Sequence, residues 1–254
     1  MVKNIWKDCH GDAHIAVLQN KAWRIVEAQE AAATRKLVDS LDEQILLEDM
    51  IESVKPQLPD EYLKYHPLLY TAFRYPPLRH GSRFGSRFES SLWYGSLHIR
   101  TSLAEKAYYQ YHFMRASDAD YGVVSLQLTA FSVDVKTNQG INLAASPFTK
   151  YIDTISSPDS YADAQQLGSA MREANIYAFT YHSARDPDRG LNIGLFTLKA
   201  FAKKIPDARS FQSWQCVVDY RIVEFMRSSA IETESHSFPV DLFFSNGALP
   251  FPAA

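Results

Sequence analysis

The order of strand-like and helix-like segments constrains the fold of this 254-residue chain most, because the two kinds do not alternate regularly. Alternating apolar residues predict strands at 124–128, 131–135, 176–183, 192–198 and 214–220. Helical spacing predicts one helix after Thr101 and another from near Ser160. A doubly wound parallel sheet needs a helix between successive strands, so the pattern favours an α+β fold.

The N-terminal part is expected to be helical. Residues 23–54 are predicted to form one helix, because apolar side chains recur in two four-spaced rows, namely Leu37, Leu41 and Ile45, and Leu46, Met50 and Val54. Pro56 and Pro59 follow this helix and end it. We expect residues 1–60 to be a helical extension that packs on the main domain. A docking surface for a partner is the alternative use of the apolar stripe.

The remainder is expected to comprise a core and a tail. We assign residues 61–235 to the catalytic core. Residues 236–254 are apolar and rich in proline, so we expect them to form a tail packed on that core.

Composition excludes several classes of function. The net charge of −3 gives no electrostatic support for direct nucleic-acid binding. Cys9 and Cys216 cannot form a disulfide framework, and no apolar run approaches the length that a membrane span requires, so a cytoplasmic location is expected. The glycines never occur as G-x-G, and H-E-x-x-H and paired C-x-x-C are absent. We therefore expect neither a Rossmann nucleotide site nor a metal site.

Residues 71–100 form an irregular stretch that carries arginine and no lysine. Its arginines are Arg74, Arg79, Arg83, Arg87 and Arg100. A guanidinium group presents a planar fork that matches phosphate oxygens, and nearby glycines allow backbone N–H groups to approach an anion. An anion-binding loop is one interpretation. A solvated basic loop paired with the acidic N-terminal helix is the other, and the residues alone leave both open.

Two further residues have an ordinary structural explanation. Ser102 and Glu105 fit the capping box S-x-x-E, so Glu105 could simply complete the start of a helix. Ser183 lies where a strand gives way to a turn, which is a common place for serine.

Taken together, these segments resemble the RES domain family, which is named after an Arg, a Glu and a Ser. The resemblance rests on FRYPPLRHGSRFG, LWYGS, LAEKAYY and YHSARDPDRGLNIGLF, in that order, and covers residues 66–200 approximately. It implies an ADP-ribosyltransferase-like fold with a split β-sheet core. It also implies a bacterial toxin that consumes NAD+ as a substrate, with no resident cofactor, and that a helix-turn-helix antitoxin neutralises.

The resemblance also implies a set of site residues. Arg83, Glu105 and Ser183 are the expected catalytic residues, and Arg74, Tyr75, Tyr94 and Arg87 are the expected NAD+ contacts. Glu105 would stabilise the positive charge that develops on the ribose, Arg83 and Arg74 would hold the pyrophosphate, and Ser183 would orient Glu105 or the ribose. Because GSRFGSRF is nearly a duplication, Arg87 is the alternative to Arg83.

The acceptor of the ADP-ribose group stays open at this point. Water would make the protein an NAD+ glycohydrolase, and inorganic phosphate would make it a phosphorylase. Leu103 stands where a transferase of the E-x-E type has its first acid, so a mono-ADP-ribosyltransferase acting on a protein is the less favoured alternative. A non-catalytic nucleotide-binding module is the other alternative. The sequence leaves the oligomeric state open, with a homodimer as one option.

Overall fold

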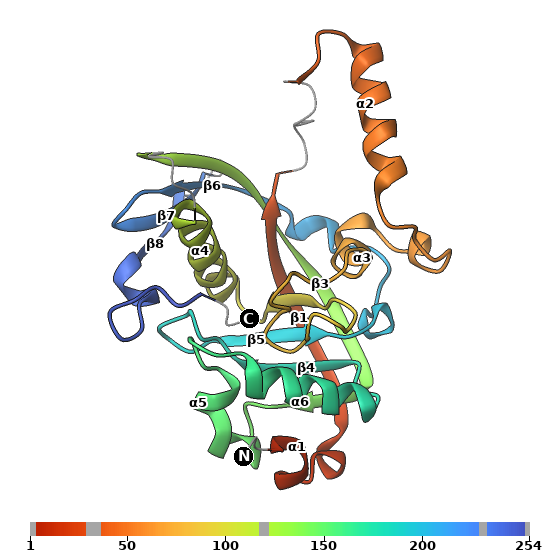
Figure 1. Cartoon of the computed structure of the whole chain (residues 1–254), viewed down its shortest axis with the longest axis vertical. Helices are drawn as coiled ribbons and strands as arrows, with labels where there is room; N and C mark the ends of the chain where they lie inside the picture. Colours follow the sequence, from red (N-terminus) through yellow and green to blue (C-terminus); the bar gives the residue numbers. More distant parts are fainter. Residues whose placement is uncertain (1–3, 29–36, 117–121, 229–232, 252–254) are drawn as a thin grey trace.

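One large mixed sheet organises the chain, and the α+β prediction is confirmed (Figure 1). The computed structural model describes residues 4–28, 37–116, 122–228 and 233–251. The sheet has eight strands in the order β1-β2-β5-β4-β3-β6-β7-β8. Their bounds are Ala16–Glu27 (β1), Trp93–Ser96 (β2), Val124–Asn142 (β3), Ala178–His182 (β4), Leu191–Leu195 (β5), Gln212–Val218 (β6), Ile222–Ser228 (β7) and Thr233–Pro239 (β8).

The long strand β3 joins the two halves of the sheet. One edge of β3 pairs with β1, from Gly140 opposite Ala16 to Leu128 opposite Glu27. Its other edge pairs with β6 at one end and, in parallel, with β4 at the other end. β1 meets β2 at Trp23 and Ser96, beyond which the two strands diverge. The sheet is therefore split between β1 and β2, as expected.

Strand β1 corrects the prediction that residues 23–54 form one helix. Residues 23–27 belong to β1, residues 29–36 lie outside the described residues, and α2 occupies Leu41–Val54. Leu18 and Ala22 of β1 are buried in a hydrophobic core. Pairing with β3 and this burial override the weak helical spacing of the segment.

Helix α2 projects from the body of the molecule (Figure 1). None of its residues is buried, and the side chains of Leu41, Ile45, Leu46, Met50 and Val54 are exposed. The prediction that this helix packs on the main domain is therefore wrong. An ion pair of 2.7 Å between Arg74 Nη2 and Glu52 Oε1, with a hydrogen bond from Arg74 Nε to the Pro56 carbonyl, ties its C-terminal end to the body.

The other helices cover the sheet. They are α1 (Ile5–Asp8), α3 (Pro67–Arg74), α4 (Ile99–Arg115), α5 (Ile152–Ile155) and α6 (Ala162–Glu173). α4 lies across β6, β7 and β8 in Figure 1, and its Leu103 and Tyr108 pack in one core with Trp214 and Phe225. α1, α5 and α6 cover the opposite end, around Phe179 of β4. Within the described ranges, no helix is long and apolar enough to cross a membrane.

The ends of the chain contribute to this sheet directly. β1 lies before residue 60 and pairs with β3, and β8 spans residue 235. After β8, Val240 and Phe243 are buried in the same core as α4. The sheet thus contains strands from both sides of residue 60, and one strand runs through residue 235. The domain boundaries at these two residues stay a prediction.

Candidate active site

A cavity of about 250 Å³ lies where β1 and β2 diverge. Its lining comprises Trp23, Arg24, Ile25, Ser82, Arg83, Leu92, Tyr94, Gly95, Ser96, Ser102, Glu105, Lys106, Tyr109, Tyr161, Tyr181 and Asn192. These residues come from β1, β2, β4, β5, α4 and the loop before β2, apart from Tyr161, which immediately precedes α6. A pocket with an apolar wall and a few converging polar groups is the usual form of a ligand site.

Glu105 is the carboxylate of this cavity. Its Oε1 accepts hydrogen bonds of 2.6 Å from Ser183 Oγ and 2.6 Å from Asn192 Nδ2. α4 begins at Ile99, so Glu105 lies in the second turn, and Ser102 Oγ donates instead to the Trp23 carbonyl at 3.1 Å. The capping-box interpretation is therefore wrong, and the hydrogen-bond partners of Glu105 are Ser183 and Asn192 instead of the start of the helix.

Ser183 lies in the loop turn directly after β4, and its side chain contacts Glu105. Its Oγ accepts from the backbone N–H groups of Arg185 at 3.1 Å and Asp186 at 3.0 Å. A hydroxyl that accepts two hydrogen bonds has one proton left to donate, and the Glu105 carboxylate receives it. Ser183 is thus both the turn residue that its position suggests and a partner of Glu105.

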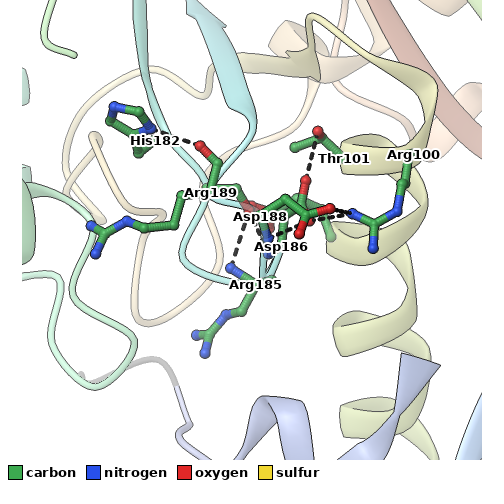
Figure 2. A network of polar contacts seen from close by, with 9 residues as sticks. Arg100, Thr101, His182, Arg185, Asp186, Asp188 and Arg189 are labelled. Carbon is green, nitrogen blue, oxygen red and sulfur yellow. Dashed lines mark hydrogen bonds and ion pairs between the residues drawn. The ribbon is translucent and has the colours of Figure 1, made fainter. Parts of the chain in front are cut away.

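A polar network holds this turn against the start of α4 (Figure 2). Thr101 Oγ1 donates to Asp186 Oδ2 at 2.8 Å, and Arg100 Nη1 contacts Asp186 Oδ1 at 2.9 Å. Arg100 also pairs with the exposed Asp188 carboxylate. The turn is therefore fixed to the same helix that carries Glu105.

Arg83 is buried at the other side of the cavity. Its Nη1 donates to the carbonyls of Ser157 at 2.6 Å and Ile155 at 3.3 Å, and its Cζ lies 4.6 Å from the centre of the Tyr161 ring. Nε and Nη2 have no hydrogen bond to any residue in the described ranges. The guanidinium is thus held in place with part of its fork available to an anion.

Tyr94 fixes the loop that carries Arg83. Its Oη lies 2.9 Å from Ser82 Oγ and accepts from the Phe84 N–H at 3.1 Å. Burial raises the pKa of the Tyr94 phenol to about 12, so the group stays neutral at physiological pH. Tyr94 therefore lines the cavity and braces both neighbours of Arg83.

Two cations of the cavity escaped the sequence analysis. Arg24 donates from Nη1 to the Tyr94 carbonyl at 3.4 Å, and burial lowers its pKa to about 10. Lys106 Nζ lies 3.5 Å from Glu27, and burial also lowers the pKa of Lys106. Together with Arg83, they give the cavity lining three cationic side chains and one carboxylate, that of Glu105. The strand-forming run VLQNKAWRIV was the available signal for Arg24.

The remaining expected contacts lie outside the cavity. Arg74 is engaged by Glu52 of α2, which is the pairing with the acidic helix considered above. Tyr75 is 41% exposed, and its carbonyl accepts from Ser91 Oγ at 2.8 Å. Arg87 is exposed and lies over the Phe88 ring. The structure thus brings Arg83, Tyr94, Glu105 and Ser183 together without these three, and all the roles in catalysis stay predictions.

Comparison with known proteins gives two findings. The family model described as RES domain matches residues 59–219 of this chain. A chain of the crystal structure of the M. tuberculosis MbcT–MbcA toxin–antitoxin complex superimposes with a TM-score of 0.45 and 11% sequence identity, over 84% of this chain and 92% of that chain. No curated protein matches the sequence.

Proposed function

Since this chain belongs to the RES domain family, we propose that it binds NAD+ and cleaves the nicotinamide–ribose bond. The observation that carries the proposal is the Glu105 carboxylate. It is held by two donors at 2.6 Å in a cavity whose lining includes three cationic and several aromatic side chains. A fixed carboxylate beside a sugar is the group that stabilises an oxocarbenium-like transition state.

The charges of the cavity suit a dinucleotide. Arg24, Arg83 and Lys106 outnumber Glu105 in the lining, with Lys106 also paired to Glu27 outside it, and this positive balance suits the two negative charges of the NAD+ pyrophosphate. The free part of the Arg83 fork can take phosphate oxygens in the bidentate manner that arginine favours. Tyr94 and Tyr181 offer aromatic surface for the flat nicotinamide ring.

The proposed reaction follows from this arrangement. The bond between C1′ of the ribose and the ring nitrogen of nicotinamide breaks, and its electron pair moves to that nitrogen, which becomes neutral. Positive charge develops on C1′ and the ring oxygen, and Glu105 stabilises it. An oxygen of water or of inorganic phosphate then forms the new bond to C1′, and the water pathway releases a proton. Ser183 and Asn192 keep Glu105 aimed throughout.

We further propose that the chain is a toxin that a helix-turn-helix antitoxin neutralises, as membership of the RES domain family suggests. Expression without such a partner is then expected to arrest bacterial growth and to lower cellular NAD+. Growth that continues with unchanged NAD+, while folded protein accumulates, would remove support for this role.

The enzymatic proposal is tested with the purified full chain and NAD+. We expect free nicotinamide, measured by chromatography, together with ADP-ribose in phosphate-free buffer or phosphorylated ADP-ribose in phosphate buffer. A product in one buffer alone identifies the acceptor. Folded protein that releases no nicotinamide in either buffer would falsify the proposal.

A further inference from the structure

We propose that Asp186 is a positioning residue, which clamps the turn 183–186 onto α4 and so directs the Ser183 hydroxyl proton at Glu105. The effect on catalysis rests on the proposed function, whereas the effect on the hydrogen bond between Ser183 and Glu105 does not. Asp186 lies outside the cavity lining, so it acts through Ser183.

The clamp has two points of contact on one face of α4. Thr101 and Glu105 are four residues apart, so their side chains lie one above the other on the helix surface. Thr101 Oγ1 holds the Asp186 carboxylate at 2.8 Å, and Glu105 Oε1 holds the Ser183 hydroxyl at 2.6 Å. A shift of the turn along or away from α4 would break both contacts together.

The backbone of Asp186 sets the direction of the Ser183 proton. Its N–H donates to Ser183 Oγ at 3.0 Å, and this bond and the one from the Arg185 N–H occupy the acceptor side of that oxygen. The hydroxyl proton is thereby left for Glu105. Without a fixed residue 186, the hydroxyl could rotate and donate elsewhere.

The Asp186 carboxylate is built into its surroundings. Only 5% of the residue is exposed, and its Oδ1 accepts from Arg100 Nη1 at 2.9 Å and from the Asp188 N–H at 3.1 Å (Figure 2). A Cβ at Gly190 would lie 2.1 Å from Thr101 Oγ1 and 2.7 Å from Asp186 Oδ2, so the loop closes tightly over this contact. A buried carboxylate that accepts from three partners, Arg100, Thr101 and the Asp188 N–H, specifies one position of the turn.

The principal variant is Asp186→Ala, and Asp188→Ala is its matched control. Asp188 belongs to the same loop and pairs with Arg100, but its side chain is 72% exposed and does not touch the turn at Ser183. We expect Asp186→Ala to lower kcat about 10- to 100-fold, which corresponds to the loss of one hydrogen bond to a charged group, with the KM for NAD+ unchanged. Asp188→Ala should stay within about twofold of the parent chain.

A conservative variant and a double variant separate positioning from general support of the fold. Asp186→Asn keeps an oxygen acceptor for Arg100 and an amide that can pair with Thr101 Oγ1, so it should restore kcat to within about fivefold. In a Ser183→Ala background, Asp186→Ala should have no further effect on kcat. Additive losses in the double variant, or a loss that appears in KM alone, would overturn the proposal.

A crystal structure of Asp186→Ala provides a readout that does not depend on activity. We expect the Ser183 Oγ to Glu105 Oε1 distance to exceed hydrogen-bonding range in this variant and to stay near 2.6 Å in Asp188→Ala. If the parent chain releases no nicotinamide, the proposed function fails while this comparison still decides the role of Asp186. An unchanged distance overturns the role. If Asp186→Ala does not fold, Thr101→Val removes the donor of the same hydrogen bond with little change of shape, and the same lengthening is expected.

Discussion

Replacing Glu105 with glutamine isolates the charge of the carboxylate from its hydrogen bonds. Both donors, Ser183 Oγ and Asn192 Nδ2, bond to Oε1, and a glutamine amide oxygen can accept both at that place. Two unit charges about 4 Å apart interact by about 4 kcal/mol at an effective dielectric constant of about 20. Because about 1.4 kcal/mol corresponds to a factor of ten, Glu105→Gln should slow nicotinamide release about 10³-fold.

The assay compares kcat, KM and unfolding of Glu105→Gln with those of the parent chain. Glu173→Gln, at an exposed position on α6, makes the same chemical change away from the cavity and should leave kcat unchanged. The free energy of unfolding of Glu105→Gln should fall by no more than about 1 kcal/mol, since both hydrogen bonds persist with a neutral acceptor. A variant that retains more than a tenth of the parent kcat would refute the electrostatic role. A variant that chiefly unfolds would show that Glu105 is structural.

Three further predictions concern stability and reactivity. A Cβ at position 168 would lie 2.1 Å from the Phe84 carbonyl oxygen, so Gly168→Ala should lower the free energy of unfolding, measured in urea, by about 1–3 kcal/mol and displace the loop that carries Arg83. A variant as stable as the parent would contradict the close packing of α6 on this loop. Burial raises the pKa of the Cys216 thiol to about 12, so a disulfide reagent at pH 8 should label this cysteine only after unfolding, and rapid labelling of the folded chain would contradict its burial. Burial raises the pKa of Tyr108 to about 12 from its ordinary value of 10.0, so the unfolded state loses this proton first and the free energy of unfolding should fall as pH rises from about 10 towards 12. Tyr108→Phe should reduce that fall, and urea denaturation curves that are identical for the two chains across this pH range would count against the shift.

Strands with regular alternation could be predicted from the sequence, whereas strands that depend on distant partners could not. β6 alternates cleanly through Trp214, Cys216 and Val218, all of which are buried. β1 carries mixed spacing, and its burial comes from β3, more than a hundred residues later in the chain. β7 and β8 were missed for a different reason: they are neighbours in the chain that pair at the edge of the sheet, and β8 is mostly polar with one buried residue, so it lacks apolar alternation.

The parts of the candidate site follow the same division. The family pattern identified Glu105, Ser183 and Arg83, and the structure places all three in or beside one cavity. Local spacing could not show that Glu105 lies past the start of its helix, because α4 starts at Ile99 after His98, which makes no side-chain capping hydrogen bond. It also could not find Arg24, whose strand lies outside the residues that the family model matches.

The position of β1 has a consequence for how the molecule must be made. The cavity takes Arg24 from the first strand and Asn192 from the fifth, so the site cannot exist until at least the first 192 of the 254 residues have been synthesised. Pairing of β1 with β3 closes a loop of about a hundred residues, an entropic cost that slows folding. A fragment cut to residues 59–219 would lack β1, β7 and β8 and would leave both edges of the remaining sheet unpaired. We expect such a fragment to aggregate on expression, whereas the full chain stays folded.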